Sequence, residues 1–244
     1  MSVSLQNTHI GFYSEDIPFW QELARQSTGP ILELGCGTGR VLLSMAQSGR
    51  RVYGIDNERG VLALLRSRIT PDQKKYARIL QADTAAFHFD LHFGLIIAPC
   101  NTYSSFSNKT RRRTLSNVRF HLHEDGVFAL SLPNPTTLKH LPARSEPEVE
   151  EIFPHPLDGE PVQVSSSWEH SDRFITVQWH YDHLLPDGGI ERSSTQIKHN
   201  LISTRDYLAE IQSAGFIINN TYGNYDRSPH RQDSPNLIIL ASKI

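Results

Sequence analysis

The first half of the chain alternates short apolar runs with longer amphipathic segments, a pattern typical of a parallel β-sheet covered by helices on both faces. The apolar runs predict strands at 30–34, 51–55, 77–81, 93–98 and 126–132. The amphipathic segments predict helices at 15–27, 38–48, 58–68 and 108–122. The last of these strands stops at a turn, PNP (133–135).

The pattern changes after this turn. Residues 136–160 are rich in proline and acid and show no period, which predicts a long loop or lid. Three strand-like runs follow, at 162–170, 174–185 and 190–203. A PDGG turn joins the last two, so we expect a small antiparallel β insertion.

The α/β pattern then returns. Thr204 is expected as the N-cap of a helix that stops at Gly215, and two closing strands are expected at 216–222 and 236–243. The predicted fold class is therefore α/β: a doubly wound, mostly parallel, seven-stranded sheet with a small antiparallel β insertion. The expected division is an α/β core that binds a cofactor, a lid loop with the insertion, and the C-terminal part of the core, at 1–135, 136–203 and 204–244.

A glycine-rich stretch, ILELGCGTGR (31–40), follows the first apolar run directly. A glycine inside a regular element costs about 0.5–1 kcal/mol relative to alanine, so three in five residues predict positive φ or bare backbone beside a ligand. The dinucleotide pattern Gly-x-Gly-x-x-Gly fails at Arg40, and no Gly-Lys-Ser/Thr of a Walker loop is present. These two ligand classes are therefore not favoured.

Three acids lie at the ends of three successive predicted strands. Glu33 precedes the glycines, Asp56 ends the second strand about twenty residues later, and Asp83 follows the third strand. A carboxylate at Asp56 can accept both hydroxyls of a ribose. Each acid alone is typical of a turn, but the three in order indicate a cofactor site.

The segment with Glu33 and the three glycines on an acid-x-Gly-x-Gly-x-Gly motif resembles the class I S-adenosylmethionine-dependent methyltransferases. The resemblance covers residues 10–132 well and 204–244 fairly. It implies a Rossmann-like fold, with S-adenosyl-L-methionine as cofactor, an acid near its ammonium group and Asp83 at its adenine amino group. The residues implied at the cofactor are Tyr13, Glu33, Gly35, Cys36, Gly37, Gly39, Asp56, Asn57, Asp83, Thr84, Pro99 and Asn101.

The end of the fourth strand, LIIAPCNTYSSF, lacks the Asn/Asp-Pro-Pro-Tyr motif of DNA and glutamine methyltransferases, which argues against a flipped base or a protein amide as substrate. The inserted sheet resembles that of small-molecule N- and O-methyltransferases. We therefore expect methyl transfer to a nitrogen or oxygen atom of a small molecule. Two alternatives stay open: a tRNA or protein methyltransferase, with KTRRR (109–113) as its footprint, and a non-catalytic S-adenosylmethionine-binding protein.

No catalytic residue is assigned from the sequence. Displacement from a sulfonium has an excellent leaving group, so positioning and desolvation can supply most of the catalysis. The candidates for a base are His180, His183 and Tyr103, while Trp168 and Trp179 fit a pocket and a core equally.

Composition and charge narrow the partners. Twenty-four basic and 26 acidic residues give a net charge of −2, so no global field attracts nucleic acid or an anionic membrane, and KTRRR is expected on a solvated helix face. Acids interrupt the N-terminal segment where a signal peptide would be apolar, and no apolar run approaches about 18 residues. We expect a cytoplasmic protein with a small-molecule acceptor and without nucleic-acid or membrane partners, and leave a homodimer open.

The cysteines and histidines predict neither a disulfide nor a metal site. Cys36 and Cys100 suit a reducing compartment and form no zinc-type pair. A helix end is expected to separate the histidines of HLH (121–123), and His180 and His183 should face opposite sides of a strand.

Overall fold

The computed structural model describes residues 2–244, with the side chains of residues 2–4 left aside. It divides into two compact units. The larger unit consists of Glu15–Thr137 and Ile202–Ile244, and the smaller of the N-terminal residues through Ser14 with Leu138–Leu201. The N-terminal segment therefore groups with the insertion, whereas the sequence had placed it in the α/β core.

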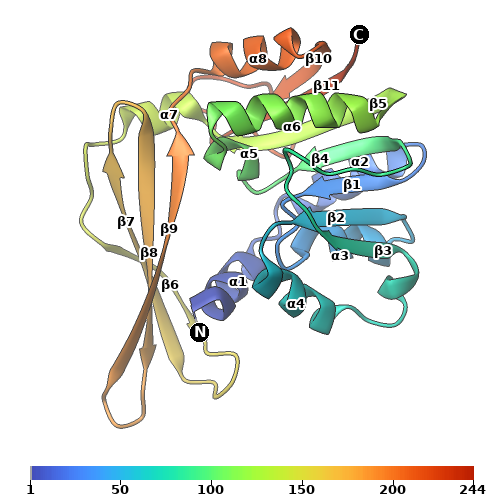
Figure 1. Ribbon diagram of the computed structural model, residues 1–244. Helices are drawn as coiled ribbons and strands as arrows, with labels where there is room; N and C mark the ends of the chain where they lie inside the picture. Colours follow the sequence, from blue (N-terminus) through green and yellow to red (C-terminus); the bar gives the residue numbers. More distant parts are fainter. Residues whose placement is uncertain (1) are drawn as a thin grey trace. The chain divides into compact units, whose positions relative to one another are not determined.

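The larger unit is built on a seven-stranded sheet (Figure 1). Its strands are β1 (Ile31–Leu34), β2 (Val52–Asp56), β3 (Ala77–Gln81), β4 (Phe93–Ala98), β5 (Leu122–Pro133), β10 (Phe216–Tyr222) and β11 (Asn236–Lys243). Their order in the sheet is β10-β11-β5-β4-β1-β2-β3, and β11 runs antiparallel to its neighbours while the others are parallel. The expected fold class is confirmed.

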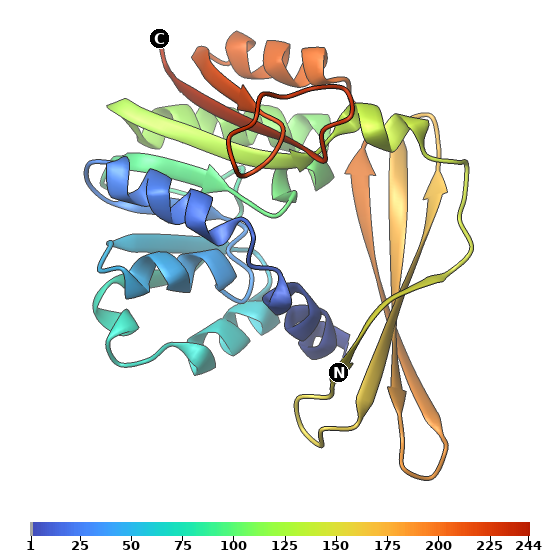
Figure 2. The same cartoon turned by 180° about the vertical axis from the view of Figure 1, so that it is seen from behind.

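Helices cover both faces of this sheet. They are α2 (Ile17–Gln26), α3 (Arg40–Gln47), α4 (Arg59–Arg68), α5 (Thr102–Ser105), α6 (Asn108–His121) and α8 (Thr204–Ser213), with a 3-10 turn, η1 (Gln73–Lys75), before β3. Apolar residues of α5, α6 and α8 join one hydrophobic cluster, and those of α2, α3 and α4 join the other. Figure 2 shows the helices on the two sides of the sheet from behind. Among the described helices, none combines the length and the apolar character needed to cross a membrane.

Two helix starts show how local sequence fixes these elements. The Ser107 side chain accepts a hydrogen bond from the Thr110 backbone N–H and caps α6. The cap of α8 is Ser203, whose Oγ accepts from the Asp206 backbone N–H at 3.1 Å, so the expected cap at Thr204 was one residue late. Gly215 follows α8 with φ +87°, as a left-handed helix stop requires.

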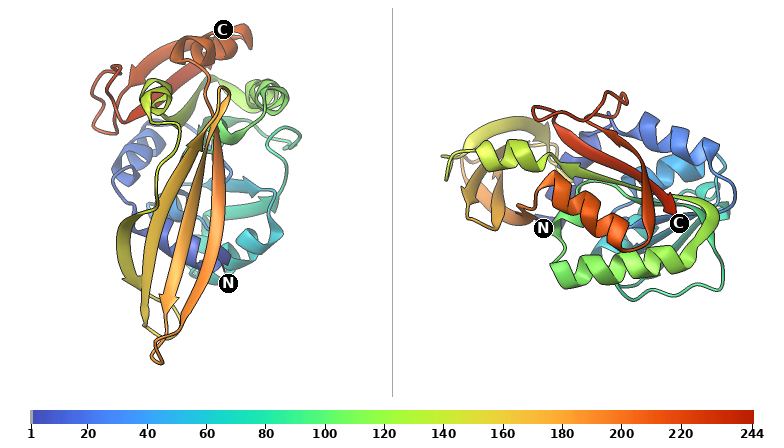
Figure 3. Two further views of the ribbon diagram at one scale, coloured as in Figure 1. Left: turned by 90° about the vertical axis from the view of Figure 1, so that its left-hand side faces the viewer. Right: turned by 90° about the horizontal axis from the view of Figure 1, so that it is seen from above.

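The smaller unit is a four-stranded antiparallel sheet with one helix (Figure 3, left). Its strand order is β6-β7-β8-β9, with a core formed by Leu5 of the helix and Phe153, Val162, Val164 and Tyr181 of the sheet. The elements are α1 (Ser2–Phe12), β6 (Glu148–Pro154), β7 (Pro161–His170), β8 (Phe174–Leu184) and β9 (Ile190–Asn200).

The expected loop over 136–160 is wrong in two places. A short helix, α7 (Pro135–His140), occupies its first residues, and β6 forms the fourth strand of the inserted sheet. β6 is an edge strand in which Phe153 alone is buried, while Glu148 and Glu150 are exposed and Glu151 is half-buried. A strand with one neighbour and so little apolar sequence does not stand out from a polar loop.

Candidate active site

Gly35, Gly37 and Gly39 form the turn between β1 and α3, with φ angles of +68°, +54° and +85°. The Cys36 N–H donates to the Ile55 carbonyl, which joins the turn to β2. Positive φ is disfavoured for residues with a Cβ atom, so the expectation drawn from the glycine spacing is confirmed.

The three glycines serve different purposes. A Cβ atom on Gly35 would lie 2.6 Å from the Thr102 Cγ2 atom, and one on Gly39 would collide with the Leu65 side chain. A Cβ atom on Gly37 would have no described atom within 4 Å. Two of the glycines therefore let protein elements approach, and Gly37 alone presents bare backbone to open space.

Asp56 fastens this turn from the end of β2. Its Oδ2 atom accepts a hydrogen bond from the Gly37 N–H at 3.0 Å, and its Oδ1 atom accepts one from the Glu58 N–H at 2.9 Å. Each carboxylate oxygen can accept further hydrogen bonds. Asp56 is thus held in place beside the glycine turn with acceptor capacity to spare.

Glu33 is a buried acid in the middle of the sheet, 2% exposed, in register with Gly54 of β2 and Ile97 of β4. Its Oε2 atom has no hydrogen-bond partner. Burial raises the pKa of Glu33 well above its ordinary range; Arg40 opposes this rise, and Asp16 and Asp56 add to it. A cation placed beside this carboxyl would favour its charged form.

Arg40, which breaks the dinucleotide pattern, closes the turn from the first position of α3. Its guanidinium forms a two-pronged ion pair with the buried Asp16, with Nη2 2.7 Å from Oδ2, and Nη2 also donates to Cys100 Sγ at 2.8 Å. Asp16 Oδ2 also accepts from the Trp20 indole at 2.9 Å. This contact from α2 to the end of β4 was not predicted, because no local motif joins its members.

The end of β4 carries unusual backbone. Cys100 and Asn101 have φ angles of 56° and 61°, a left-handed conformation that non-glycine residues rarely adopt. Such conformations cost about 1–3 kcal/mol and cluster at functional sites. The Pro99 carbonyl accepts from Thr102 Oγ1 at 2.9 Å, which closes this turn.

The other residues implied at the cofactor differ in how far their side chains are exposed. Asp83 is exposed directly after β3, with Oδ1 accepting from the Ala85 N–H at 2.8 Å, and Asn57 is also exposed. Cys36 is buried, and Thr84 is buried with its hydroxyl 3.4 Å from that of Thr114. The side chains of Cys36 and Thr84 are therefore packed inside the unit, whereas those of Asp83 and Asn57 reach solvent.

The structure alters the list of catalytic candidates. Tyr103 is fully buried beside Phe106 and Tyr207, where burial raises its pKa, and this does not favour it as a base. His180 and His183 belong to the smaller unit and do face opposite sides of β8: His183 is 2% exposed, and His180 is partly exposed with Nδ1 2.7 Å from Ser194 Oγ. Roles for these two and for Tyr13 stay predictions.

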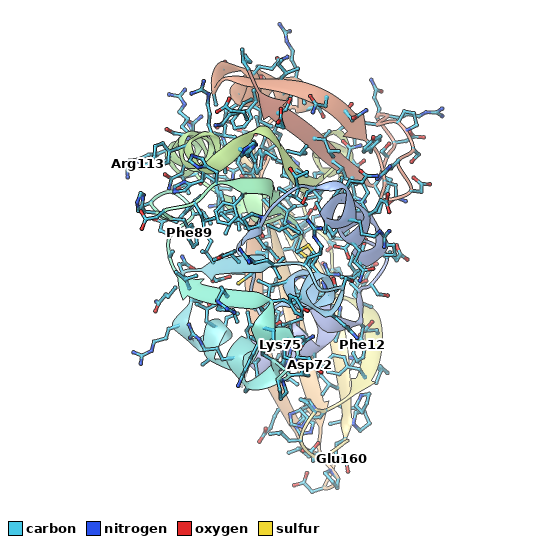
Figure 4. The ribbon with its side chains drawn as sticks, turned by 90° about the vertical axis from the view of Figure 1, so that its right-hand side faces the viewer. Phe12, Asp72, Lys75, Phe89, Arg113 and Glu160 are labelled. Atoms are coloured by element: carbon cyan, nitrogen blue, oxygen red, sulfur yellow. The ribbon has the colours of Figure 1, made fainter. Side chains whose placement is uncertain are left out.

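The basic cluster at the start of α6 is only partly a solvated face. Arg111 is 2% exposed; its Nε donates to Glu210 at 3.0 Å and its Nη1 donates to the Phe106 carbonyl. Lys109, Arg112 and Arg113 are exposed, and Arg113 projects outward from the helix (Figure 4).

Comparison with known proteins gives a domain match and a fold. Residues 31–126 match the family described as a methyltransferase domain. This range runs from β1 into β5 and contains the glycine turn, Asp56, Asp83 and the end of β4. The match therefore includes the cluster of residues described above, apart from Asp16.

Solved structures extend the likeness over both units. An S-adenosylmethionine-dependent methyltransferase from Clostridium acetobutylicum ATCC 824 has a TM-score of 0.82 at 14% identity, covering 98% of this chain and 96% of that one. The S-adenosylmethionine-bound CalS10, an amino pentose methyltransferase from Micromonospora echinaspora, has a TM-score of 0.71 at 16% identity, covering 100% and 92%. The glycopeptide N-methyltransferase MtfA, complexed with S-adenosylmethionine, has a TM-score of 0.62 at 22% identity, covering 96% of each chain. At these identities the likeness is one of fold.

Proposed function

We propose that the chain, which carries a methyltransferase domain over residues 31–126, is a class I S-adenosylmethionine-dependent methyltransferase that transfers a methyl group to a nitrogen or oxygen atom of a small molecule. The proposal has two parts, the residues that hold the cofactor and the class of acceptor. Each rests on separate observations.

The residues of the larger unit fit S-adenosylmethionine. Glu33 offers a buried carboxyl oxygen without a partner, which suits the ammonium group of the cofactor. The bare backbone at Gly37 permits close approach, and Asp56 can accept the ribose hydroxyls. Asp83, exposed at the end of β3, is proposed for the adenine amino group.

The chain's own contribution is binding, orientation and exclusion of water. When bound, the cofactor supplies a methyl group on a sulfonium, a centre that needs no further activation by the protein. The two hydrogen bonds to Asp56 and the ion pair of Arg40 with Asp16 hold the turn in place before a ligand arrives, so little order has to be gained on binding. Orientation of this kind can supply a large part of the barrier reduction.

The observation that carries the acceptor class is the extent of the likeness to CalS10. The match covers 100% of this chain, so it includes the four-stranded sheet as well as the α/β unit. CalS10 is described as acting on an amino pentose, and MtfA as a glycopeptide N-methyltransferase. Together with Pro99-Cys100-Asn101 in place of a Pro-Pro-Tyr motif, this supports an acceptor outside nucleic acid and protein.

A tRNA or protein acceptor has less support from the described residues. The basic cluster on α6 loses Arg111 to its ion pair with Glu210, and three exposed cations remain there on a chain of net charge −2. Affinity for nucleic acid depends on many such phosphate contacts.

The test is a labelling experiment on the full chain. Methyl-labelled S-adenosylmethionine is incubated with three separate pools, a low-mass metabolite extract, bulk tRNA and mixed protein, and each is analysed by mass spectrometry. We expect label in a low-mass product, loss of label with Asp56→Ala, and retention with the exposed control Asp72→Ala.

Label confined to tRNA or protein would contradict the acceptor class. Calorimetric binding of S-adenosylmethionine without label in any pool would instead identify a non-catalytic binding protein.

A further inference from the structure

The smaller unit contains a cluster of two histidines and one aspartate that the function above does not use. His155 and Asp158 lie in the loop between β6 and β7, and His183 lies on β8. The Asp158 Oδ1 atom is 2.9 Å from His155 Nδ1 and 3.2 Å from His183 Nε2. Glu160 ends the same loop (Figure 4).

Both imidazole rings are buried and approach each other closely. Their side chains are 5% and 3% exposed, and the ring centroids are 4.0 Å apart with an interplanar angle of 16°. The carboxylate of Asp158 is half exposed, and its Oδ1 atom also accepts from the Glu160 N–H at 3.1 Å. Two imidazole nitrogens and one backbone N–H group thus converge on one oxygen.

His183 is left with an unsatisfied atom in this arrangement. Its Nδ1 atom is buried without a hydrogen-bond partner, and the nearest carboxylate oxygen, Glu191 Oε2, lies 4.0 Å away. Glu191 is the residue directly opposite His183 in the pairing of β8 with β9. If Nε2 of the neutral ring carries the proton toward Asp158, Nδ1 is a bare lone pair facing a carboxylate, which is unfavourable.

A metal ion on Nε2 would reverse this tautomer. The ring proton would then sit on Nδ1, where Glu191 can accept it, as carboxylates commonly do behind metal-bound histidines. The unpartnered atom and the acid beside it are thus explained together.

We propose that His155 Nδ1, Asp158 Oδ1 and His183 Nε2 bind a divalent transition-metal ion of the zinc type. These three ligand atoms lie within 4.8 Å of one another. The two spacings of 2.9 and 3.2 Å to Asp158 Oδ1 are near the edge of about 3.3 Å of a tetrahedron with bonds of about 2.0 Å. The two rings are stacked, so each must turn to bring its nitrogen lone pair onto one ion. Two histidines with a carboxylate suit zinc, with water as the fourth ligand. The ion would fasten the β6–β7 loop to β8, and the proposal departs from the absence of a metal site expected from the sequence.

The experiment measures Zn²⁺ binding to the full chain after removal of metal with a chelator. Calorimetry should give one ion per chain, saturating Zn²⁺ should raise the melting temperature, and Co²⁺ should give the absorption bands of a tetrahedral site. Asp158→Asn and His155→Gln should each weaken Zn²⁺ at least tenfold, and Glu191→Gln, behind the ligands, about tenfold.

The matched control is His180→Gln, a histidine of the same strand with its side chain on the other face, which should bind Zn²⁺ as the unchanged chain does. Circular dichroism of the half-exposed Asp158→Asn separates lost binding from lost folding. Weak binding that does not saturate, or an equal loss in His180→Gln, would overturn the proposal. So would a calorimetric titration in which Zn²⁺ gives no heat of binding.

Discussion

The Asp56 carboxylate accepts a hydrogen bond from the Gly37 backbone at 3.0 Å, so the end of β2 holds the glycine turn that leaves β1. We expect Asp56→Ala to weaken S-adenosylmethionine by about 1.5–3 kcal/mol through loss of a charge-assisted hydrogen bond. The unfolding free energy without cofactor should fall by about 1–2 kcal/mol, because the Gly37 and Glu58 N–H groups lose their acceptor.

Calorimetric titration and urea unfolding measure the two effects separately, with the exposed Asp72→Ala as control. Intact affinity for S-adenosylmethionine together with reduced stability would show that Asp56 has a structural role and that the proposed cofactor site is wrong.

Glu33→Gln should stabilise the cofactor-free chain. Because burial raises the pKa of Glu33, the folded chain holds a proton that the unfolded chain releases above about pH 4.3. The unfolding free energy therefore falls as pH rises from about 4.3 to the raised pKa of the folded chain. A glutamine does not titrate, so the variant keeps this part of the unfolding free energy. We expect a melting temperature higher by about 2–4 °C at pH 7, the shift for about 1 kcal/mol in a chain of this size.

The same variant should bind S-adenosylmethionine more weakly by about 1.5–3 kcal/mol, because an amide cannot pair with an ammonium group as a carboxylate does. Melting curves at pH 5 and pH 7, with and without cofactor, decide the matter. Parallel pH profiles for the two chains would contradict the predicted protonation of Glu33.

Gly35→Ala should mainly reduce stability, whereas Gly37→Ala should mainly reduce affinity for the cofactor. The Cβ atom of the first meets Thr102, so repacking of about 1–3 kcal/mol adds to the strain of positive φ. The second finds open space and costs about 1 kcal/mol of backbone strain, yet its Cβ atom stands where the cofactor is proposed to approach. Melting temperature should fall further for Gly35→Ala, while Gly37→Ala should lose affinity out of proportion to its stability; equal effects on both quantities would argue against this assignment.

His199 should make the smaller unit sensitive to acid. Burial lowers its pKa to about 4, so between about pH 6.5 and 4 the unfolded chain binds a proton that the folded chain does not. The unfolding free energy therefore falls as pH decreases through this window, by about 3 kcal/mol over its full extent.

Fluorescence of Trp168 and Trp179, both in this unit, follows its unfolding at pH 7 and pH 5. His199→Gln should reduce the difference between the two pH values, and the exposed control His140→Gln should not. An unchanged difference in His199→Gln would assign the acid sensitivity to other groups.

These residues also show what the sequence could and could not predict about the fold. All six residues of β4 are buried, and its continuous apolar run gave both bounds correctly. No element was expected over α1, where Leu5 is buried but the polar and apolar residues show no helical period. The edge strand β6 was interpreted as a loop for a related reason. Phe153 is its only buried residue, so its sequence shows little of the pattern of a strand. Patterning identifies elements with two buried faces best.

The same distinction applies to the site. The glycine turn was predicted because its spacing is local. Arg40 and Asp16 meet only through the packing of α2 against the start of α3, and no motif joins them. His155 and His183 come together because of the register in which β7 pairs with β8. The sequence analysis compared only histidines that are close together in the sequence, so it could not detect this pair.

The pairing of β5 with β11 has a consequence for how the chain is made. Leu130 lies opposite Ile239, and between these strands the ribosome releases the whole inserted sheet, α8 and β10. Until β11 emerges, a nascent chain carries β5 with one edge unpaired, and such an edge is a template for joining other chains. The inserted sheet forms its own internal pairs and can fold during this delay, whereas the cofactor-binding sheet is completed last. Synthesis that stalls before β11 therefore leaves this edge of β5 open to pairing with other chains.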